Sequence, residues 1–201
     1  MSDNHLKLQS LYVSYFNRPA DTAGLAFWND ALTANPNMLK DIERSFALSA
    51  EFRLEHADDS NHEIVEEIYE NLFGRDPDIN GWKYWTDLLD RKVITIDNVA
   101  THISSAAVGL DKIIFEGKVF AANMFTQRVD LPKEQAAYQG KAALDLAEDF
   151  LETITDQNSI NTALATDTID FWISRIVAEN NFGLEAVLVG VQTNADPTLT
   201  F

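Results

Sequence analysis

The chain has 201 residues, and its 46% hydrophobic content is enough for a globular core. It carries 15 Lys and Arg against 32 Asp and Glu, a net charge of -17. This charge repels nucleic acid phosphates and anionic lipid headgroups, so we expect neither as a partner. Cysteine is absent, which excludes disulfides, thiol nucleophiles and thiolate metal ligands.

The two ends of the chain bear on localisation. No apolar run approaches the roughly 20 residues of a membrane helix, so membrane insertion is not expected. Residues 1–10 are polar and lack the apolar centre of a cleaved secretory signal. The ending DPTLTF, residues 196–201, is a weak match to an uncleaved C-terminal export signal, and we favour a frayed tail. Secretion or surface display without a cleaved signal is compatible with the sequence, and cytoplasmic residence stays open.

A duplicated unit fills the first half of the chain. Residues 11–32 and 68–89 align without a gap at an offset of 57, and eight of their 22 positions are identical. Identities at a fixed offset indicate a repeated supersecondary unit. The identical pairs are Tyr12 and Tyr69, Phe16 and Phe73, Arg18 and Arg75, Asp21 and Asp78, Gly24 and Gly81, Trp28 and Trp85, Asp30 and Asp87, and Leu32 and Leu89.

The spacing predicts helix, short turn and helix within each copy. Tyr12 and Phe16 stand four residues apart, so they share one helix face. Asp21 and Asp78 come just before the second helix, where a carboxylate accepts backbone N–H groups as an N-cap. The arginines three residues earlier are expected to satisfy the last carbonyls of the first helix.

The turn of the second copy also matches a calcium-binding pattern. Asp76, Asp78, Asn80 and Gly81, followed by Asp87, fit the EF-hand loop with Asp in place of its final Glu. An N-cap at Asp78 would start a helix at once, whereas a calcium loop must stay wrapped around the ion. The first copy lacks two of the ligands, so we favour the helix start and predict no cofactor, with calcium as the alternative.

The rest of the chain also has helical periodicity. In each copy a third helix is expected, because Asp41 and Asp97, and Ser49 and Ser105, correspond at an offset of 56. Beyond the repeat, three amphipathic stretches follow, and only residues 184–192 resemble a strand. We predict an all-α fold: a duplicated helix-turn-helix domain over residues 1–109, with copies at about 5–55 and 62–109, and a helical bundle tail over 110–201 that packs on it.

The repeated LY-x3-F-x-R-x2-D-x2-G-x3-W resembles the bacterial domain of unknown function 4214. The second copy reads GRDPDINGWKYW and the first NRPADTAGLAFW, and both keep the Arg, Asp, Gly and Trp. The resemblance implies a helical module of surface-layer proteins and of calcium-dependent repeat proteins exported by type I secretion, distantly similar to phycobilisome linkers. The glycine-rich nonapeptide repeats of those proteins are missing, since the chain has only eight Gly.

In some surface-layer proteins a similar helical region holds the layer to outer-membrane polysaccharide. The resemblance therefore favours a non-enzymatic attachment or carbohydrate-binding module whose partner is a surface polysaccharide. The alternative is a structural domain that binds a protein partner or other copies of itself. No nucleophile elbow, phosphate loop, dinucleotide fingerprint or zinc-protease motif appears in the sequence, so we predict no enzyme.

Two sets of side chains, one aromatic and one in the linker, are candidates for ligand contacts. Among the aromatic residues, Trp28, Trp85 and Trp172 lie on apolar stripes and are instead expected in the core. Trp82 and Tyr84 differ, because an aromatic ring among acids and amides can stack on a sugar, although a staple over the turn is equally compatible. The linker between the copies holds a metal-capable group, for which we favour a solvated segment whose residues do not converge: His56, Asp58, Asp59, His62 and Glu63.

Overall fold

The computed structural model describes residues 3–192, with side chains described as far as residue 180 apart from Glu55. Helices dominate, and no strand occurs within the described range, so the all-α prediction is confirmed. Residues 184–192, the one stretch whose pattern resembles a strand, continue the last helix instead. DPTLTF lies outside the described residues.

The first eight α-helices form two copies of a four-helix unit, α1 to α4 and α5 to α8. The turns between the paired helices each contain a left-handed residue, Asn17 (φ 44°) and Gly74 (φ 64°), at equivalent positions of the two copies. Asn and Gly are the residues that tolerate this conformation best. In the first copy the helices are α1 (Asp3–Phe16), α2 (Thr22–Ala34), the short 3-10 helix η1 (Pro36–Met38), α3 (Leu39–Ala47) and α4 (Ala50–Glu55). In the second they are α5 (Asn61–Phe73), α6 (Ile79–Asp90), α7 (Ile96–Ala106) and α8 (Gly109–Arg128).

The third helices differ from the expected correspondence. Ser49 is the N-cap of α4, with its side chain accepting from the Phe52 amide, whereas Ser105 lies inside α7. These two serines are therefore not equivalent, because α7 is longer than α3. The start of α8 instead occupies the place that α4 has in the first copy.

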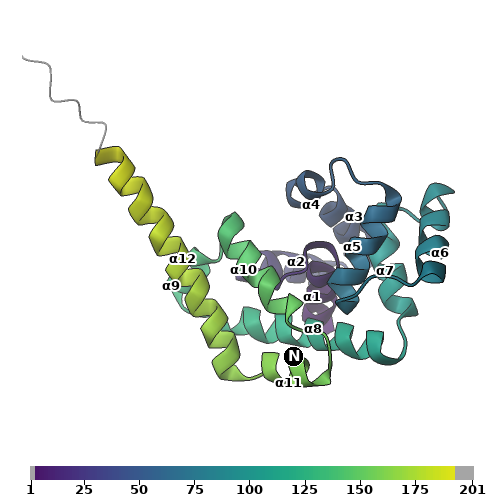
Figure 1. The fold of residues 1–201 in the computed structure, drawn as a ribbon. Coiled ribbons are helices and arrows are strands. Elements are labelled where there is room, and N and C mark those ends of the chain that lie inside the picture. Colours follow the sequence, from purple (N-terminus) through teal and green to yellow (C-terminus); the bar gives the residue numbers. More distant parts are fainter. Residues whose placement is uncertain (1–2, 193–201) are drawn as a thin grey trace, which may run out of the picture.

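The remaining helices pack around α8. Besides its contacts with α10, α11 and α12, α8 also contacts α1 and α5, so it joins the repeat to the C-terminal region (Figure 1). No described helix is both long enough and apolar enough to cross a membrane. The C-terminal helices are α9 (Pro132–Ala137), α10 (Lys141–Glu152), α11 (Gln157–Ala163) and α12 (Thr166–Gln192).

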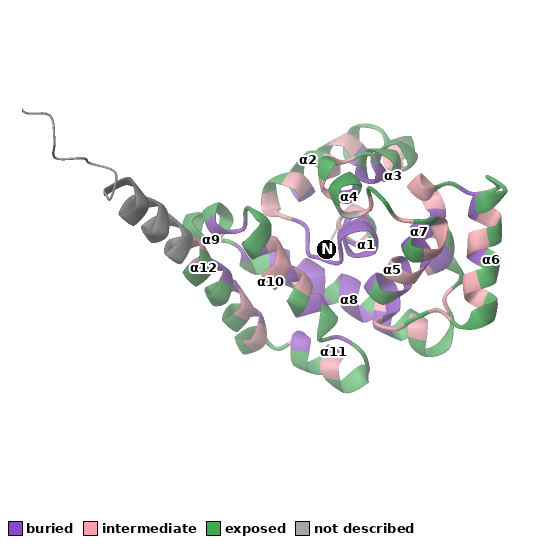
Figure 2. Ribbon diagram, turned by 45° about the horizontal axis from the view of Figure 1, so that its top comes forward, coloured by how far each residue is buried: buried purple, intermediate pink, exposed green. Residues whose placement is uncertain are grey.

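Two apolar clusters form the core. The first collects residues of α1 to α7, including Tyr15, Ile42 and Leu72. The second collects residues of α8 to α12 together with Val13 of α1. Phe115 of α8 packs against both clusters. Buried positions accordingly concentrate along α1, α5 and α8 in the middle of the molecule (Figure 2).

Candidate functional site

The repeated tyrosine, glycine and tryptophan form one contact. In the second copy the Trp85 indole Nε1 donates to the Tyr69 hydroxyl at 3.1 Å. A Cβ added at Gly81 would lie 2.8 Å from that hydroxyl, so only glycine lets α5 and α6 approach this closely. These three residues recur in the repeat because they set the packing of its two helices.

The first copy repeats the contact with a less buried tryptophan. A Cβ at Gly24 would collide with the Tyr12 hydroxyl. Burial raises the pKa of Tyr12, and a hydrogen bond with Trp28 opposes that effect. Trp85 is buried at 8% exposure, whereas Trp28 is only partly buried against the core. The expectation that all three tryptophans lie in the core therefore holds for Trp85, whereas Trp28 and Trp172 are only partly buried against it.

The repeated arginines pair with acids far along the chain. Arg18 binds Glu51 through two hydrogen bonds of 2.7 and 2.9 Å. Arg75 binds Asp111 in the same bidentate way, at 2.9 and 2.7 Å. Each arginine also donates to the carbonyl of the residue that follows it. The prediction that they satisfy the last carbonyls of the first helix is wrong. Each guanidinium instead binds a carbonyl of the turn that follows and an acidic residue in the first turn of a later helix, α4 or α8.

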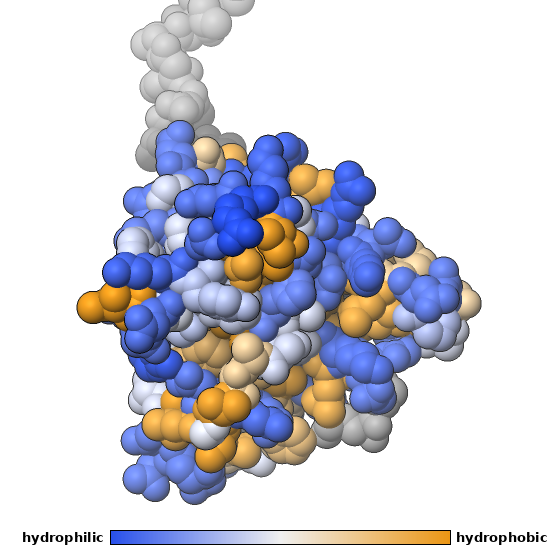
Figure 3. All heavy atoms as spheres, turned by 90° about the vertical axis from the view of Figure 1, so that its right-hand side faces the viewer, coloured by the Kyte–Doolittle hydropathy of each residue, from blue (hydrophilic) through white to orange (hydrophobic). Residues whose placement is uncertain are grey.

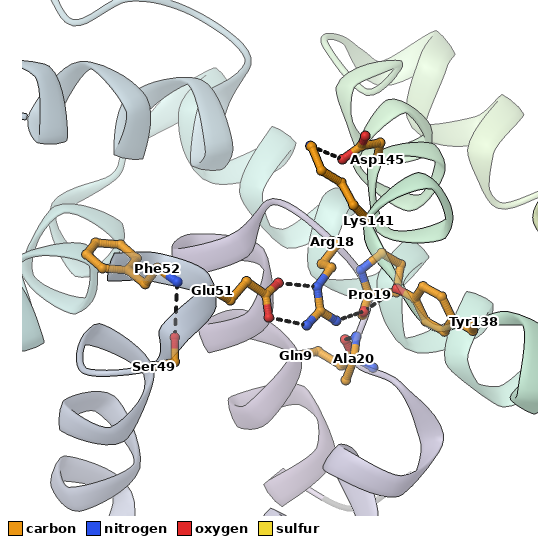
Figure 4. Close-up of polar contacts among 10 residues, drawn as sticks. All are labelled: Gln9, Arg18, Pro19, Ala20, Ser49, Glu51, Phe52, Tyr138, Lys141 and Asp145. Atoms are coloured by element: carbon orange, nitrogen blue, oxygen red, sulfur yellow. Dashed lines mark hydrogen bonds and ion pairs between the residues drawn. The ribbon is translucent and has the colours of Figure 1, made fainter. Parts of the chain in front are cut away.

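The C-terminal region covers the first turn. The Tyr138 hydroxyl donates to the Pro19 carbonyl at 2.5 Å, and Thr126 Oγ1 donates to the Ala20 carbonyl at 2.7 Å. Figure 4 shows Arg18 between Glu51 and this covered turn. Arg18 is 5% exposed, whereas the side chain of Arg75 is 41% exposed. The two copies therefore share their internal contacts and differ in what lies over the turn.

The turn of the second copy leads directly into a helix, as favoured above, and does not have the course of a calcium loop. Asp78 is the N-cap of α6 and accepts from the Asn80 and Gly81 amides at 2.9 and 3.0 Å, which lowers its pKa. Asn80 and Asp87 belong to α6, and Asp87 pairs with Arg91 at 3.0 Å. Asp76 is exposed in the turn. The four candidate calcium ligands are therefore not arranged as a calcium loop.

The two candidate sugar-stacking residues have separate surroundings. Trp82 packs against the core, and its ring meets His62 at 4.3 Å between ring centres. Tyr84 is 58% exposed and contacts Trp85 edge to face. The two rings have different neighbours, so their contacts do not define a shared platform.

Removing either cap should weaken the fold. Asp21 accepts from the Gly24 amide at 2.7 Å, and its change to Ala should cost about 1 kcal/mol, the usual value for an N-cap. Asp78→Ala should lower the midpoint in the same direction. Urea unfolding of both variants measures the effect. Asp30→Ala, on the exposed side of α2, is the control and should leave the midpoint in place. Unchanged midpoints for both cap variants would contradict this account.

A polar cleft opens where the two copies meet the C-terminal region. Its volume is about 590 Å³, and it lies among the ends of α1 and α5, the middle of α8, and α10. In the ribbon views α1 lies between α5 and α10 (Figures 1 and 2). The cleft is lined by Phe16, Asn17, Glu67, Glu70, Asn71, Gly74, Lys118, Glu148, Glu152 and Thr155.

Lys118 is a buried cation in the wall of this cleft. It has 0% exposure, and its Nζ donates to the Asn71 carbonyl at 2.9 Å and to the Glu70 carbonyl at 3.2 Å. These carbonyls belong to the last turn of α5, so Lys118 performs the helix-end role that we had expected of Arg75. Burial lowers the pKa of Lys118 to about 8, although Glu152 and Glu70 act in the opposite direction.

The other polar groups give the cleft an acidic mouth. Four carboxylates line it against the single lysine. Burial raises the pKa of Glu70, and the charges of Asp76 and Glu152 add to this effect. Asn17 is 8% exposed, and its Oδ1 has no hydrogen-bond partner in the described part of the chain. The cleft thus combines hydrogen-bond donors and acceptors with one aromatic ring, Phe16.

Lys118 should titrate well below an ordinary lysine. Its folded pKa of about 8 lies below the roughly 10.4 of an unfolded chain. The unfolded state then binds more protons between these values, so this group destabilises the fold below about pH 8 and ceases to do so as the pH rises past 10. The 13Cε chemical shift of Lys118, assigned with Lys118→Arg, measures the titration. A midpoint shared with the exposed lysines would contradict the burial described here.

The metal-capable residues of the linker converge only in part. His56 Nδ1 lies 2.8 Å from Asp59 Oδ2 and 3.3 Å from Glu67 Oε2 of α5. These three residues form a group that could hold an ion. Glu63 instead closes a capping box with Ser60 at the start of α5. The expectation that no linker residues converge is therefore wrong for His56 and Asp59. Glu67 of α5, which no sequence pattern indicated, joins them.

These features define the class of the protein: an all-α scaffold in which a duplicated helix-turn-helix unit packs on a helical tail. Residues 43–107, from α3 to the end of α7, match the family model of the domain of unknown function DUF4214. This match supports the resemblance to that family which the repeated signature indicates. No curated protein and no solved structure matches the chain.

Proposed function

We propose that the chain is a non-enzymatic carbohydrate-binding module that attaches a secreted or surface-layer-type bacterial protein to surface polysaccharide. The observation that carries the proposal is the polar cleft of about 590 Å³ between α5 and α10. The repeated signature residues are committed to packing and capping, so the cleft is where polar groups stay available to a ligand. Secretion and type I export are part of the proposal and rest on the family resemblance.

The chemistry of the cleft suits sugar hydroxyls. Carboxylates such as Glu70 and Glu152 accept hydrogen bonds, and the amide of Asn71 can donate and accept. Asn17 also lines the cleft, and its side-chain amide has donor and acceptor groups. Phe16 supplies an apolar edge. In this proposal the cleft binds and orients a polyol.

Binding to an array of bacterial surface polysaccharides tests the proposal. The purified chain should bind some of the glycans, and a Glu70→Gln, Glu152→Gln double variant should lose at least tenfold in affinity. Both residues are exposed at the mouth of the cleft, so the variant should fold. Asp145→Asn on α10, which lies outside this cleft, is the matched control and should bind normally. An array without any specific signal would overturn the proposal.

Self-assembly is the second candidate function. At the start of α8, Val108, Leu110 and Ile113 are 77%, 56% and 45% exposed. Apolar side chains also lie among hydrophilic ones on the face that carries α6 (Figure 3). Exposed apolar groups of this kind favour contact with another protein. A stable oligomer in light scattering that is lost on Leu110→Ser, together with no glycan binding, would favour this function.

A further inference from the structure

We propose that His56, Asp59 and Glu67 bind a divalent transition-metal ion. His56 closes the end of α4, Asp59 belongs to the linker between the copies, and Glu67 lies in the middle of α5. Each offers one donor atom, and these atoms all lie within 4.8 Å of one another. The proposal does not rest on the carbohydrate function.

The distances suit a small ion. A tetrahedral site with bonds of about 2.0–2.1 Å places neighbouring donors about 3.3 Å apart. The Nδ1 of His56 already stands 3.3 Å from Glu67 Oε2, and its 2.8 Å distance to Asp59 Oδ2 needs only a small opening. Two carboxylates balance the charge of a divalent ion. An imidazole ligand favours zinc and similar ions over calcium and magnesium, which prefer oxygen alone.

The histidine is held in place before any ion arrives. Its side chain is 4% exposed, and its ring packs at 4.1 Å from the ring of Phe52. Nε2 is buried and has no hydrogen-bond partner among the described residues, so the polar contacts of the ring are concentrated at Nδ1. The carboxylates of Asp59 and Glu67 are 28% and 34% exposed. An ion can therefore reach Nδ1 from the carboxylate side, where solvent would complete its coordination.

An ion here would tie the linker to the second copy. His56 and Asp59 come before α5 in the chain, and Glu67 is on that helix. Binding in the folded state alone raises the stability of the whole domain. Glu67 also lines the polar cleft, so the ion would reduce the negative charge of the cleft while leaving its other carboxylates in place.

Titration calorimetry of the metal-free chain with Zn²⁺ tests the proposal. We expect one saturable site and a rise in melting temperature larger than equal concentrations of Ca²⁺ or Mg²⁺ produce. Asp59→Asn and Glu67→Gln should each weaken Zn²⁺ binding at least tenfold. The matched control is His62→Ala, because His62 also has a carboxylate 3.3 Å from its Nδ1, that of Glu66, but belongs to no such three-residue group among the described residues.

His56→Ala should abolish the site, and the two carboxylate variants decide the matter if that variant fails to fold. Three results would overturn the proposal. The first is no saturable Zn²⁺ binding. The second is an affinity unchanged in Asp59→Asn and Glu67→Gln, or lost equally in His62→Ala. The third is a Ca²⁺ or Mg²⁺ stabilisation as large as that of Zn²⁺, which would mean general screening of the acidic chain.

Discussion

Replacing Arg18 with Met is expected to cost about 3 kcal/mol of unfolding free energy, because it leaves Glu51 without its partner beside a buried turn. Arg18 is 5% exposed and also donates to the Pro19 carbonyl at 3.2 Å. Arg18→Lys should recover little of this loss, since an ammonium cannot make the two parallel hydrogen bonds to the carboxylate.

The second copy supplies the matched control. Arg75 makes the same bidentate contact to Asp111, but its side chain is 41% exposed. Arg75→Met should therefore cost less than about 1 kcal/mol, as exposed pairs do. Urea unfolding of the two variants gives the comparison. Equal losses of unfolding free energy in the two variants would mean that the C-terminal region over the first turn does not strengthen the contact between Arg18 and Glu51.

Truncating Trp85 to Ala should cost about 3 to 5 kcal/mol, the range for a large aromatic removed from a core. The ring is 8% exposed, and its Nε1 donates to Tyr69 at 3.1 Å. Trp28→Ala should cost clearly less, because Trp28 is only partly buried. The two variants should therefore lose different amounts of unfolding free energy, although the two copies have the same residue at this position.

Chemical denaturation of the two tryptophan variants measures the difference, and acrylamide quenching gives an independent reading. Each of the two should be observed in a variant where the other tryptophans are replaced by Phe. Trp85 should be the better protected from the quencher. Equal protection, or a larger loss for Trp28→Ala, would contradict the burial of these residues described here.

The sequence was sufficient for the fold class and for the local geometry of the turn. Period-3.6 patterns identify helices because they report which face is buried, and the caps at Asp21 and Asp78 follow from short-range hydrogen bonds. It was ambiguous at residues 184–192, where a run of apolar residues suits a strand or a helix equally well and the preceding helix continues.

The partners of the repeated residues could not be predicted. Arg18 pairs with Glu51 and Arg75 with Asp111 at sequence separations of 33 and 36 residues. Helical periodicity does not predict which residues come into contact over such separations. The difference between Trp28 and Trp85 is also tertiary, because identical residues receive different cover from their surroundings.

The cleft was missed for the same reason. Its lining combines α1, α5, α8 and α10, which only the tertiary fold brings together. One local signal was available: Lys118 lies within an amphipathic stretch whose buried face also carries Ala121, Ala122 and Phe125. A lysine within such a helix must find acceptors when it is buried, and this requirement points to a polar site.

The measurement that tests the account most directly is amide chemical-shift mapping of the chain titrated with a surface polysaccharide fragment that it binds. The account predicts shifts at Asn17, Asn71, Lys118 and Thr155, and a binding loss in the Glu70→Gln, Glu152→Gln variant with Tyr84→Ala unaffected. Shifts confined to α6 around Tyr84, with binding lost in Tyr84→Ala and kept in the cleft variant, would contradict it.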